Sequence, residues 1–221
     1  MLTLAHLKQH LYSPGCLHCG SFFVQEHLFC KECFSEKVIT EFNLQDHIIQ
    51  ENLRHYFLIK WVPGQSDLLS RLIYQLKNNK SPIAWQYYAQ QFILALAGEF
   101  PSDFFDAIVP LPGSTPSSSH SVLFAEALAN YLRCPVLNCL QKSTGQLAQK
   151  TQTAKQRREL ADTILLREKD EFFTQQMFKS MRILYVDDIL TTGATFIQSY
   201  RALQSRSDSC IFTLFHRTRN N

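Results

Sequence analysis

The stretch RILYVDDILTTGAT, residues 182–195, decides the fold. Its apolar residues 183–186 predict a buried strand that ends in two adjacent carboxylates, Asp187 and Asp188. A loop of Thr, Gly and Ala then leads directly into an expected helix over residues 196–203. At the carboxyl end of a parallel strand, such a loop opens onto the crevice where α/β proteins bind ligands. This stretch therefore predicts a binding site at the end of its strand.

The composition of the loop favours a phosphate group as its ligand. Small residues let backbone N–H groups converge on an anion, and the hydroxyls of Thr191, Thr192 and Thr195 add donors. The positive end of the helix dipole favours the same charge. Asp187 and Asp188 would then face the hydroxyls of an attached sugar. The loop lacks the glycine and lysine spacing of a P-loop, so a P-loop nucleotidase is disfavoured.

Elements on either side of this stretch continue an alternation of strands and helices. Short apolar runs at residues 106–111, 136–140 and 210–215 predict strands, and residues 122–132 predict an amphipathic helix. Because such alternation indicates βαβ units, we predict an α/β fold with a parallel sheet and flanking helices.

Residues 41–100 are interpreted as a mainly helical segment. Apolar residues recur at helical spacing over residues 68–76, and Ser66 is a plausible cap for that helix. A second helix is expected to begin at Pro82, which suits the first helical turn, and to run to Gly98.

Four of the seven cysteines lie close together near the N-terminus. They form two C-x-x-C pairs with ten residues between them, and Gly15 and Gly20 flank the first pair. In a reducing cytosol this spacing predicts a structural Cys₄ zinc site. Its ligands would be Cys16, Cys19, Cys30 and Cys33. We interpret residues 1–40 as a small zinc-ribbon-like module and residues 41–221 as the main domain.

Other interpretations of these cysteines stay open. Cys16 and Cys19 could form a redox pair, although the flanking residues do not suggest the strand and helix of a thioredoxin-like motif. A disulfide is disfavoured in the cytosol. His18 and His27 lie close enough in sequence to replace a cysteine ligand.

The aromatic residues of this module also allow two interpretations. Phe22, Phe23 and Phe29 would either form its small core or stack on single-stranded bases. Local charge gives little support for nucleic-acid binding, because residues 1–60 contain five Lys plus Arg and six Asp plus Glu.

The overall composition is that of a globular protein. Hydrophobic residues make up 45%, which excludes disorder and collagen-like repetition, and 22 Lys plus Arg against 19 Asp plus Glu leave a net charge of only +3. Such a small excess does not by itself predict a nucleic-acid surface. No stretch approaches the ~20 apolar residues of a membrane span, and no signal region is visible at the N-terminus. We expect a cytoplasmic protein without membrane insertion.

Residues 182–195 resemble the phosphoribosyl-pyrophosphate (PRPP) signature of type I phosphoribosyltransferases. The resemblance covers the apolar strand, the two acids, two further apolar residues and the Thr-Thr-Gly loop. It implies that Asp187 and Asp188 hold the ribose 2′ and 3′ hydroxyls. The 5′-phosphate would be cradled by Thr191, Thr192, Gly193, Ala194 and Thr195. Hypoxanthine-type enzymes carry an acid where this chain has Thr191, so purine salvage is disfavoured and the motif supplies no general base.

The order of motifs along the chain is similar to that of the ComF family of competence proteins. A Cys₄ module precedes Leu76 and Lys77, then the sequence Ile-Val-Pro-Leu-Pro at residues 108–112, then the PRPP loop. The resemblance implies that backbone amides near the strand end bind pyrophosphate, which here means Pro110, Leu111 and Pro112. On the residues alone, two prolines that end a strand explain the same sequence.

Two segments depart from the family pattern. Its Arg-Gly-Phe-Asn-Gln element is replaced by Pro-Ser-Ser-Ser-His at residues 116–120, which removes an arginine and two amides expected near the ligand. A second motif is kept only in part, at Gln149, Thr153 and Arg157. A basic stretch nevertheless occupies the position of the mobile loop that closes over pyrophosphate in related enzymes. It comprises Lys150, Lys155, Arg157 and Arg158, which a solvated basic helix face would equally explain.

The resemblance implies a function in natural competence. The chain would bind PRPP with Mg²⁺ and handle imported single-stranded DNA in the cytoplasm, together with other competence proteins. Whether it is an enzyme is open, and neither a catalytic residue nor an acceptor substrate is assigned. The alternatives are an adaptor that senses PRPP without turnover, and a zinc-dependent DNA-binding module whose PRPP site is vestigial.

Overall fold

The structure is a computed structural model of the 221-residue chain. It describes residues 15–49, 53–79, 81–96, 98–101, 103–113, 119–142, 164–166 and 175–218. The basic stretch from Lys150 to Arg158 lies outside these residues, so its predicted role stays a prediction. Among the helices of the described residues, none combines the length and apolar character that crossing a bilayer requires.

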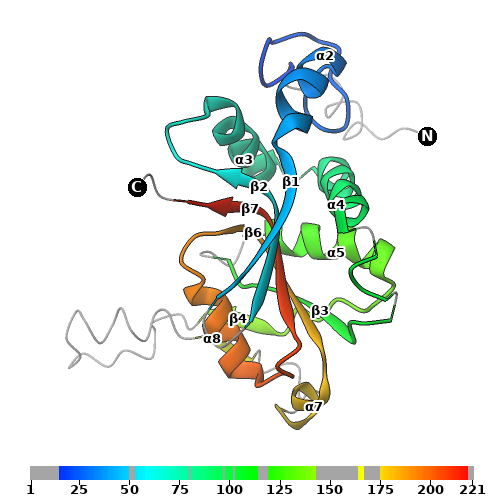
Figure 1. The fold of residues 1–221 in the computed structure, drawn as a ribbon, viewed down its shortest axis with the longest axis vertical. Coiled ribbons are helices and arrows are strands. Elements are labelled where there is room, and N and C mark those ends of the chain that lie inside the picture. Colours follow the sequence, from blue (N-terminus) through cyan, green and yellow to red (C-terminus); the bar gives the residue numbers. More distant parts are fainter. Residues whose placement is uncertain are drawn as a thin grey trace, which may run out of the picture.

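A five-stranded sheet forms the centre of the molecule (Figure 1). Its strands are β1 (Phe42–Ile48), β2 (Arg54–Trp61), β3 (Ala107–Pro110), β6 (Ile183–Leu190) and β7 (Cys210–Arg217). They lie in the order β1-β2-β7-β6-β3, with β1 antiparallel to β2 and every other pair parallel. The predicted α/β fold with a largely parallel sheet is confirmed.

The helical interpretation of residues 41–100 is wrong for β1 and β2. Tyr56, Phe57, Leu58 and Ile59 form a continuous buried run in β2, which lies between β1 and β7. A short apolar run of this kind fits a buried helix or a buried strand, and periodicity does not separate the two. The neighbouring strands on both sides decide for the strand.

Helices cover both faces of the sheet (Figure 1). The described ones of six or more residues are α3 (Asp67–Asn79), α4 (Pro82–Leu96), α5 (His120–Leu132), α7 (Gln175–Ser180) and α8 (Ala194–Leu203). The predicted cap of α3 is confirmed, because Ser66 Oγ accepts a hydrogen bond from the Leu69 N–H at 3.2 Å. The predicted start of α4 at Pro82 is confirmed as well.

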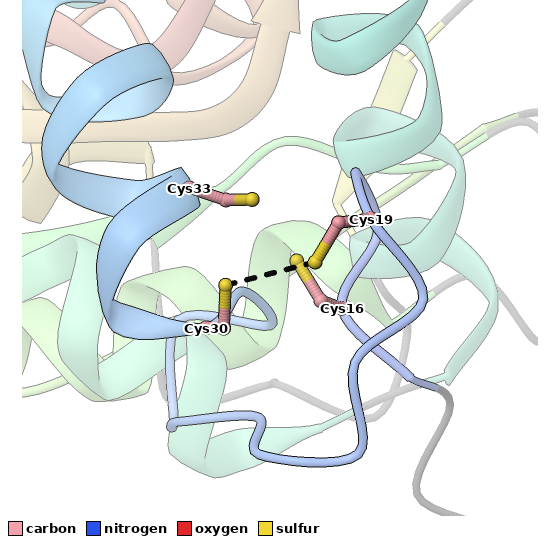
Figure 2. Close-up of side chains that lie close together, drawn as sticks. All are labelled: Cys16, Cys19, Cys30 and Cys33. Atoms are coloured by element: carbon pink, nitrogen blue, oxygen red, sulfur yellow. Dashed lines mark hydrogen bonds between the residues drawn. The ribbon is translucent and has the colours of Figure 1, made fainter.

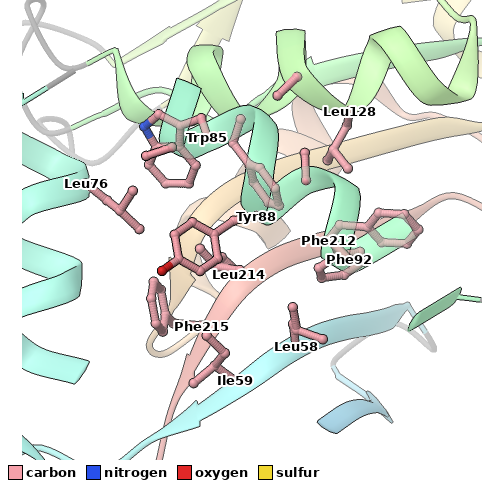
Figure 3. Packing of buried hydrophobic residues seen from close by; sticks show 14 of the residues in the cluster. Leu58, Ile59, Leu76, Trp85, Tyr88, Phe92, Leu128, Phe212, Leu214 and Phe215 are labelled. Atoms are coloured by element: carbon pink, nitrogen blue, oxygen red, sulfur yellow. The ribbon is translucent and has the colours of Figure 1, made fainter. Parts of the chain in front are cut away.

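The hydrophobic core divides into two clusters, one on each face of the sheet. The larger cluster joins α3, α4 and α5 to the sheet through residues such as Leu76, Trp85 and Phe212 (Figure 3). The smaller one lies under α8 and includes Tyr185 and Phe196. Alternate residues of β6 enter alternate clusters, which is the period-two pattern of a strand buried on both faces.

A small second sheet lies beside the main one. It pairs β4 (Leu140–Lys142) with β5 (Ile164–Leu166) antiparallel. The strand predicted at residues 136–140 is therefore misplaced: Val136 makes only an isolated bridge with Ile108. Pro135, which lacks an N–H group, contributes only its carbonyl to Ile108 and cannot extend the ladder.

The cysteine segment packs directly on the main core. After its loop come α2 (Lys31–Cys33), a π-helical turn (Phe34–Val38) and a 3₁₀ turn (Ile39–Glu41). Phe29 and Phe34 belong to the same cluster as the α4 residues, and the Tyr88 hydroxyl donates to the His27 carbonyl at 2.9 Å. The hydrophobic core thus continues across the proposed domain boundary at residue 40.

Candidate functional site

The two acids of β6 lie where a neighbouring strand has ended. The last register pair between β3 and β6 is Pro110 with Val186, and the Leu111 N–H donates to the Val186 carbonyl at 2.8 Å. β7 continues alongside on the other edge, where Asp187 pairs with Thr213. The acids therefore lie within β6, which runs on to Leu190, and just past its last register pair with β3.

Asp188 is buried and has two partners from distant helices. Its side chain is 4% exposed, and its Oδ2 lies 3.0 Å from Nζ of Lys77 on α3. Its Oδ1 lies 3.4 Å from Nε2 of His120, the first residue of α5. The Lys77 side chain is 37% exposed, so the ion pair joins the buried carboxylate of Asp188 to an ammonium group that reaches solvent.

Asp187 lies in a different electrostatic environment. Its Oδ1 accepts the Asp188 N–H at 2.9 Å. Burial, followed by the neighbouring carboxylate of Asp188, raises the pKa of Asp187 well above its ordinary value. A nearby cation or hydrogen-bond donor would stabilise the charged form of this carboxylate and so lower its pKa.

Three side chains at this point could share a cation. Ligand atoms of His120, Asp187 and Asp188 all lie within 4.8 Å of one another. Carboxylate oxygens are the ligands that Mg²⁺ prefers, and Mg²⁺ is usually held by one or two of them together with substrate phosphates. The donor set therefore fits the predicted Mg²⁺ when a phosphorylated ligand completes it.

The predicted phosphate loop follows β6 and turns into α8. Gly193 has φ +74°, a left-handed conformation that favours glycine, and it precedes the first helical residue, Ala194. The Ala194 N–H donates to Oγ1 of Thr192 at 3.4 Å, while Thr191 and Thr192 are exposed. Two exposed threonines thus precede the N-terminus of α8, the combination of hydroxyl donors and helix dipole that suits an anion.

The predicted pyrophosphate loop has fewer amide donors than its resemblance implies. Pro110 and Pro112 carry no N–H group, and the Leu111 N–H is already bonded to Val186. The Leu111 carbonyl accepts from Ser121 Oγ at 2.7 Å, which ties the loop to α5. Any amides offered to pyrophosphate from this loop must therefore come from residues after Pro112.

The four predicted zinc ligands come together in space (Figure 2). Their sulfur atoms all lie within 4.8 Å of one another, and Sγ of Cys19 is 3.8 Å from Sγ of Cys30. A tetrahedral ion with Zn–S distances of ~2.3 Å places its sulfurs ~3.8 Å apart. All seven cysteines of the chain are free thiols. The geometry of this cluster fits Zn²⁺.

The backbone around the first pair forms the turn that brings its cysteines together. The Cys16 N–H donates to the Ser21 carbonyl at 2.8 Å, and the Gly20 N–H donates to the Cys16 carbonyl at 2.9 Å. A Cβ at Gly15 would lie 2.5 Å from the Gly20 carbonyl oxygen, so only glycine fits there. Gly20 itself has φ +76°.

The thiols of the cluster differ in how readily they lose their protons. Burial opposes ionisation of Cys16, but the backbone N–H groups of Cys19, Cys30 and His18 outweigh it and lower the pKa of Cys16 to about 6. Burial and the neighbouring thiols raise the pKa of Cys33 well above its ordinary value. Four thiolates this close would repel one another, and a divalent cation removes that repulsion.

The histidines near the cysteines have other partners. Nε2 of His27 lies 2.9 Å from Oε1 of Gln25, its Nδ1 accepts the Phe29 N–H, and its ring stacks on Phe34. His18 is exposed and is not among the clustered ligands. Neither histidine replaces a cysteine in the cluster.

The expectation that the phenylalanines form the core of the module is wrong for two of them. Phe29 is fully buried, but Phe22 and Phe23 are 94% and 87% exposed. They follow the turn that carries Cys16 and Cys19. Both rings are therefore available to a partner.

Sequence reasoning missed Lys77 and His120 as members of the acidic site. In the sequence, Lys77 stands out only through the family resemblance, and His120 only as a departure from the family pattern. No local signal connects either residue with Asp188, because the three lie on separate elements that the fold brings together.

The chain matches no protein-family model and no curated protein.

Its structure is similar to solved adenine phosphoribosyltransferases. The one from Saccharomyces cerevisiae is 16% identical with a TM-score of 0.42, over 84% of this chain and 89% of that one. The one from Thermoanaerobacter pseudethanolicus is 17% identical with a TM-score of 0.38, over 82% and 99%. The one from Trypanosoma brucei, in complex with AMP, pyrophosphate and ribose-5-phosphate, is 12% identical with a TM-score of 0.39, over 80% and 87%. Similarity of this degree says nothing of substrate or reaction.

Proposed function

We propose that this chain binds PRPP together with Mg²⁺ at the end of β6. The observation that carries the proposal is the placement of Asp187 and Asp188 past the end of β3, with four residues between Asp188 and Gly193, where the chain turns into α8. Carboxylates suit ribose hydroxyls, and a helix N-terminus with exposed threonines suits a phosphate. PRPP carries both groups on one sugar.

Each part of the site has a distinct role in this proposal. Asp187 and Asp188 accept hydrogen bonds from the ribose 2′ and 3′ hydroxyls, and residues 191–195 hold the 5′-phosphate. Mg²⁺, when bound, neutralises charge on the pyrophosphate group. Lys77, whose side chain already reaches solvent, leaves Asp188 and turns to the phosphates, and this uncovers the Asp188 carboxylate for the ribose hydroxyl.

A transferase reaction at this site would depend on electrostatics rather than on a general base. The C1–O bond of PRPP breaks, the pyrophosphate departs with the bonding electrons, and the ribose becomes an oxocarbenium ion. The carboxylates fix the ribose as this charge develops. An acceptor that is already nucleophilic then attacks C1 without needing a base from the loop.

A PRPP-sensing adaptor without turnover is the second candidate. It is favoured by the substitution of the Arg-Gly-Phe-Asn-Gln element, after which His120 contacts Asp188 where the family carries glutamine. An arginine that could stabilise the departing pyrophosphate is absent from residues 116–120. Binding would then survive while catalysis does not.

We further propose that the chain acts in natural competence, as in the ComF family, on single-stranded DNA in the cytoplasm and with other competence proteins. The exposed rings of Phe22 and Phe23 support contact with unpaired bases, since bases stack on aromatic side chains without regard to sequence. Lys150, Lys155, Arg157 and Arg158 would contribute phosphate contacts, which make binding salt-dependent.

One experiment separates these candidates. Calorimetric titration of the full chain with PRPP and Mg²⁺ measures binding, and a pyrophosphate-release assay with and without single-stranded DNA measures turnover. Binding with release identifies a transferase, and binding without release identifies an adaptor. If PRPP does not bind at all, the proposal for the β6 site is wrong.

A further inference from the structure

Three histidines from three strands meet on one face of the sheet, apart from both sites described above. His47 on β1, His55 on β2 and His216 on β7 have ring nitrogens that all lie within 4.8 Å of one another. The centroid of the His47 ring lies 4.9 Å from the centroid of the His55 ring and 4.7 Å from that of the His216 ring. His55 is fully buried, while the other two are partly exposed.

The hydrogen bonds around His55 fix which of its nitrogens carries a proton. The Thr213 hydroxyl donates to the Phe215 carbonyl at 2.8 Å. The same Oγ1 lies 2.7 Å from Nε2 of His55, and because its own proton is used, it must accept from a protonated Nε2. In the neutral ring, Nδ1 of His55 is then left with a lone pair.

Among the residues that the structure describes, none gives that lone pair a hydrogen bond. Nδ1 of His55 is buried without a hydrogen bond, and so is Nδ1 of His216. A buried polar atom without a partner is unfavourable, and two of them in one cluster need an explanation. A metal-bound histidine characteristically donates its second N–H to an oxygen of the protein, as His55 does to Thr213.

The surroundings keep these imidazoles uncharged. Burial lowers the pKa of His55 to about 2 and that of His216 to about 4, and it lowers the pKa of His47 too. The Phe57 ring contacts all three, with centroids 4.6 to 5.8 Å away. Neutral imidazole is the form that binds metal ions.

We propose that His47, His55 and His216 bind one divalent transition-metal ion of the Zn²⁺ class. Three neutral nitrogen ligands suit Zn²⁺, Co²⁺, Ni²⁺ or Cu²⁺ and do not suit Mg²⁺ or Ca²⁺, which take oxygen ligands. Among the described residues, the cluster contains no carboxylate and no thiol. Three protein ligands leave the fourth tetrahedral position open to water or to another ligand.

The geometry requires a small adjustment on binding. Zn–N distances of 2.0–2.1 Å in a tetrahedral site place the nitrogens ~3.3 Å apart, so ring nitrogens that are now within 4.8 Å of one another must move closer together. His47 and His216 are partly exposed and can turn toward the fixed His55. His216 pairs in register with Leu190, the residue before the phosphate loop, but the proposal does not depend on PRPP binding.

Calorimetric titration of the full chain with Zn²⁺, after its Cys₄ site has been filled, tests the proposal. We expect one further equivalent to bind. Co²⁺ added to the same protein should give visible d–d bands without thiolate charge-transfer bands, because the ligands are nitrogens. The double variant His47→Gln with His216→Gln should lose this equivalent, whereas His18→Gln, which changes an exposed histidine outside the cluster, should keep it.

A second variant tests the role of Thr213. Thr213→Val preserves volume and leaves the imidazoles in place but removes the acceptor for His55 Nε2, so affinity for Zn²⁺ should fall about 10- to 100-fold. No further equivalent in the wild type, or an unchanged one in the double histidine variant, would overturn the proposal. Either result would assign the three rings to packing around Phe57 alone.

Discussion

Nζ of Lys77 lies 3.0 Å from Oδ2 of Asp188, and this ion pair joins α3 to β6 across the larger hydrophobic cluster. Asp188 is nearly inaccessible, whereas more than a third of the Lys77 side chain reaches solvent. The lysine can therefore exchange its carboxylate partner for a ligand phosphate while it stays solvated, and a ribose hydroxyl takes its place as the donor to Asp188. We propose that this exchange accompanies PRPP binding.

Lys77→Met tests this exchange. Loss of a charge-assisted contact of ~1.5–3 kcal/mol should weaken Mg²⁺·PRPP binding by about one to two decades. The free energy of unfolding should also fall by ~1–3 kcal/mol, less than for a fully buried pair, because Lys77 is partly solvated. Lys179→Met, at an exposed position on α7, is the control for calorimetry and thermal melting. Unchanged PRPP affinity would contradict a phosphate contact by Lys77.

Asp187→Asn combined with Asp188→Asn should abolish PRPP binding while the protein stays folded. Two charge-assisted bonds of ~1.5–3 kcal/mol each correspond to roughly two to four decades in affinity. The fold should survive because Asn keeps the volume and because Lys77, left without its partner, can solvate its charge. Calorimetry measures affinity, and metal analysis checks that the cysteine site is intact. A double variant that binds within a few-fold of wild type would show that the site is elsewhere.

The raised pKa of Asp187 predicts a pH dependence of stability in metal-free buffer. The folded state holds the Asp187 proton to higher pH than the unfolded state does, so its contribution falls as pH rises from ~4 through the folded pKa. Asp187→Asn removes this loss. We expect the variant to gain stability relative to wild type at pH 7 and to lose that advantage near pH 3. Urea unfolding across this range measures it, and parallel curves would refute the assignment.

Cys16→Ser with Cys19→Ser should remove one equivalent of zinc per chain and lower the melting temperature. Structural zinc contributes folding free energy directly, and three of the four cysteines belong to the hydrophobic cluster that holds Phe29 and Phe34. Cys134→Ser, which changes a half-buried thiol outside the group of four cysteines, should leave the zinc content unchanged. Elemental analysis and calorimetry decide, and full zinc retention in the double variant would contradict a Cys₄ site.

Phe22→Ala with Phe23→Ala should weaken binding of single-stranded DNA without changing stability. Stacking of a base on an aromatic ring contributes ~1–3 kcal/mol, so each ring accounts for about 5- to 150-fold in affinity. Both rings are almost fully exposed, so their removal leaves no cavity. Fluorescence anisotropy with an unlabelled competitor measures affinity, and Tyr74→Ala at another exposed aromatic is the control. Equal affinity of wild type and double variant would place any DNA contact elsewhere.

The sequence alone determined the features whose residues are contiguous or regularly spaced. The acids, Gly193 and the N-terminus of α8 follow one another along the chain, so their relation is set by local backbone geometry. The cysteine knuckles depend on short turns, and Gly15 and Gly20 specify them. Local propensity did not distinguish a buried strand from a buried helix at β2, because an apolar run fits both.

Tertiary structure decided the features that depend on strand order and helix docking. Lys77 and His120 reach Asp188 only because α3 and α5 pack on the same face of β6. His55 and His216 meet because β2 lies beside β7, a parallel pairing of segments from opposite ends of the chain. Such contacts follow from how whole faces of the sheet and the helices are buried against each other, which a local sequence pattern does not predict.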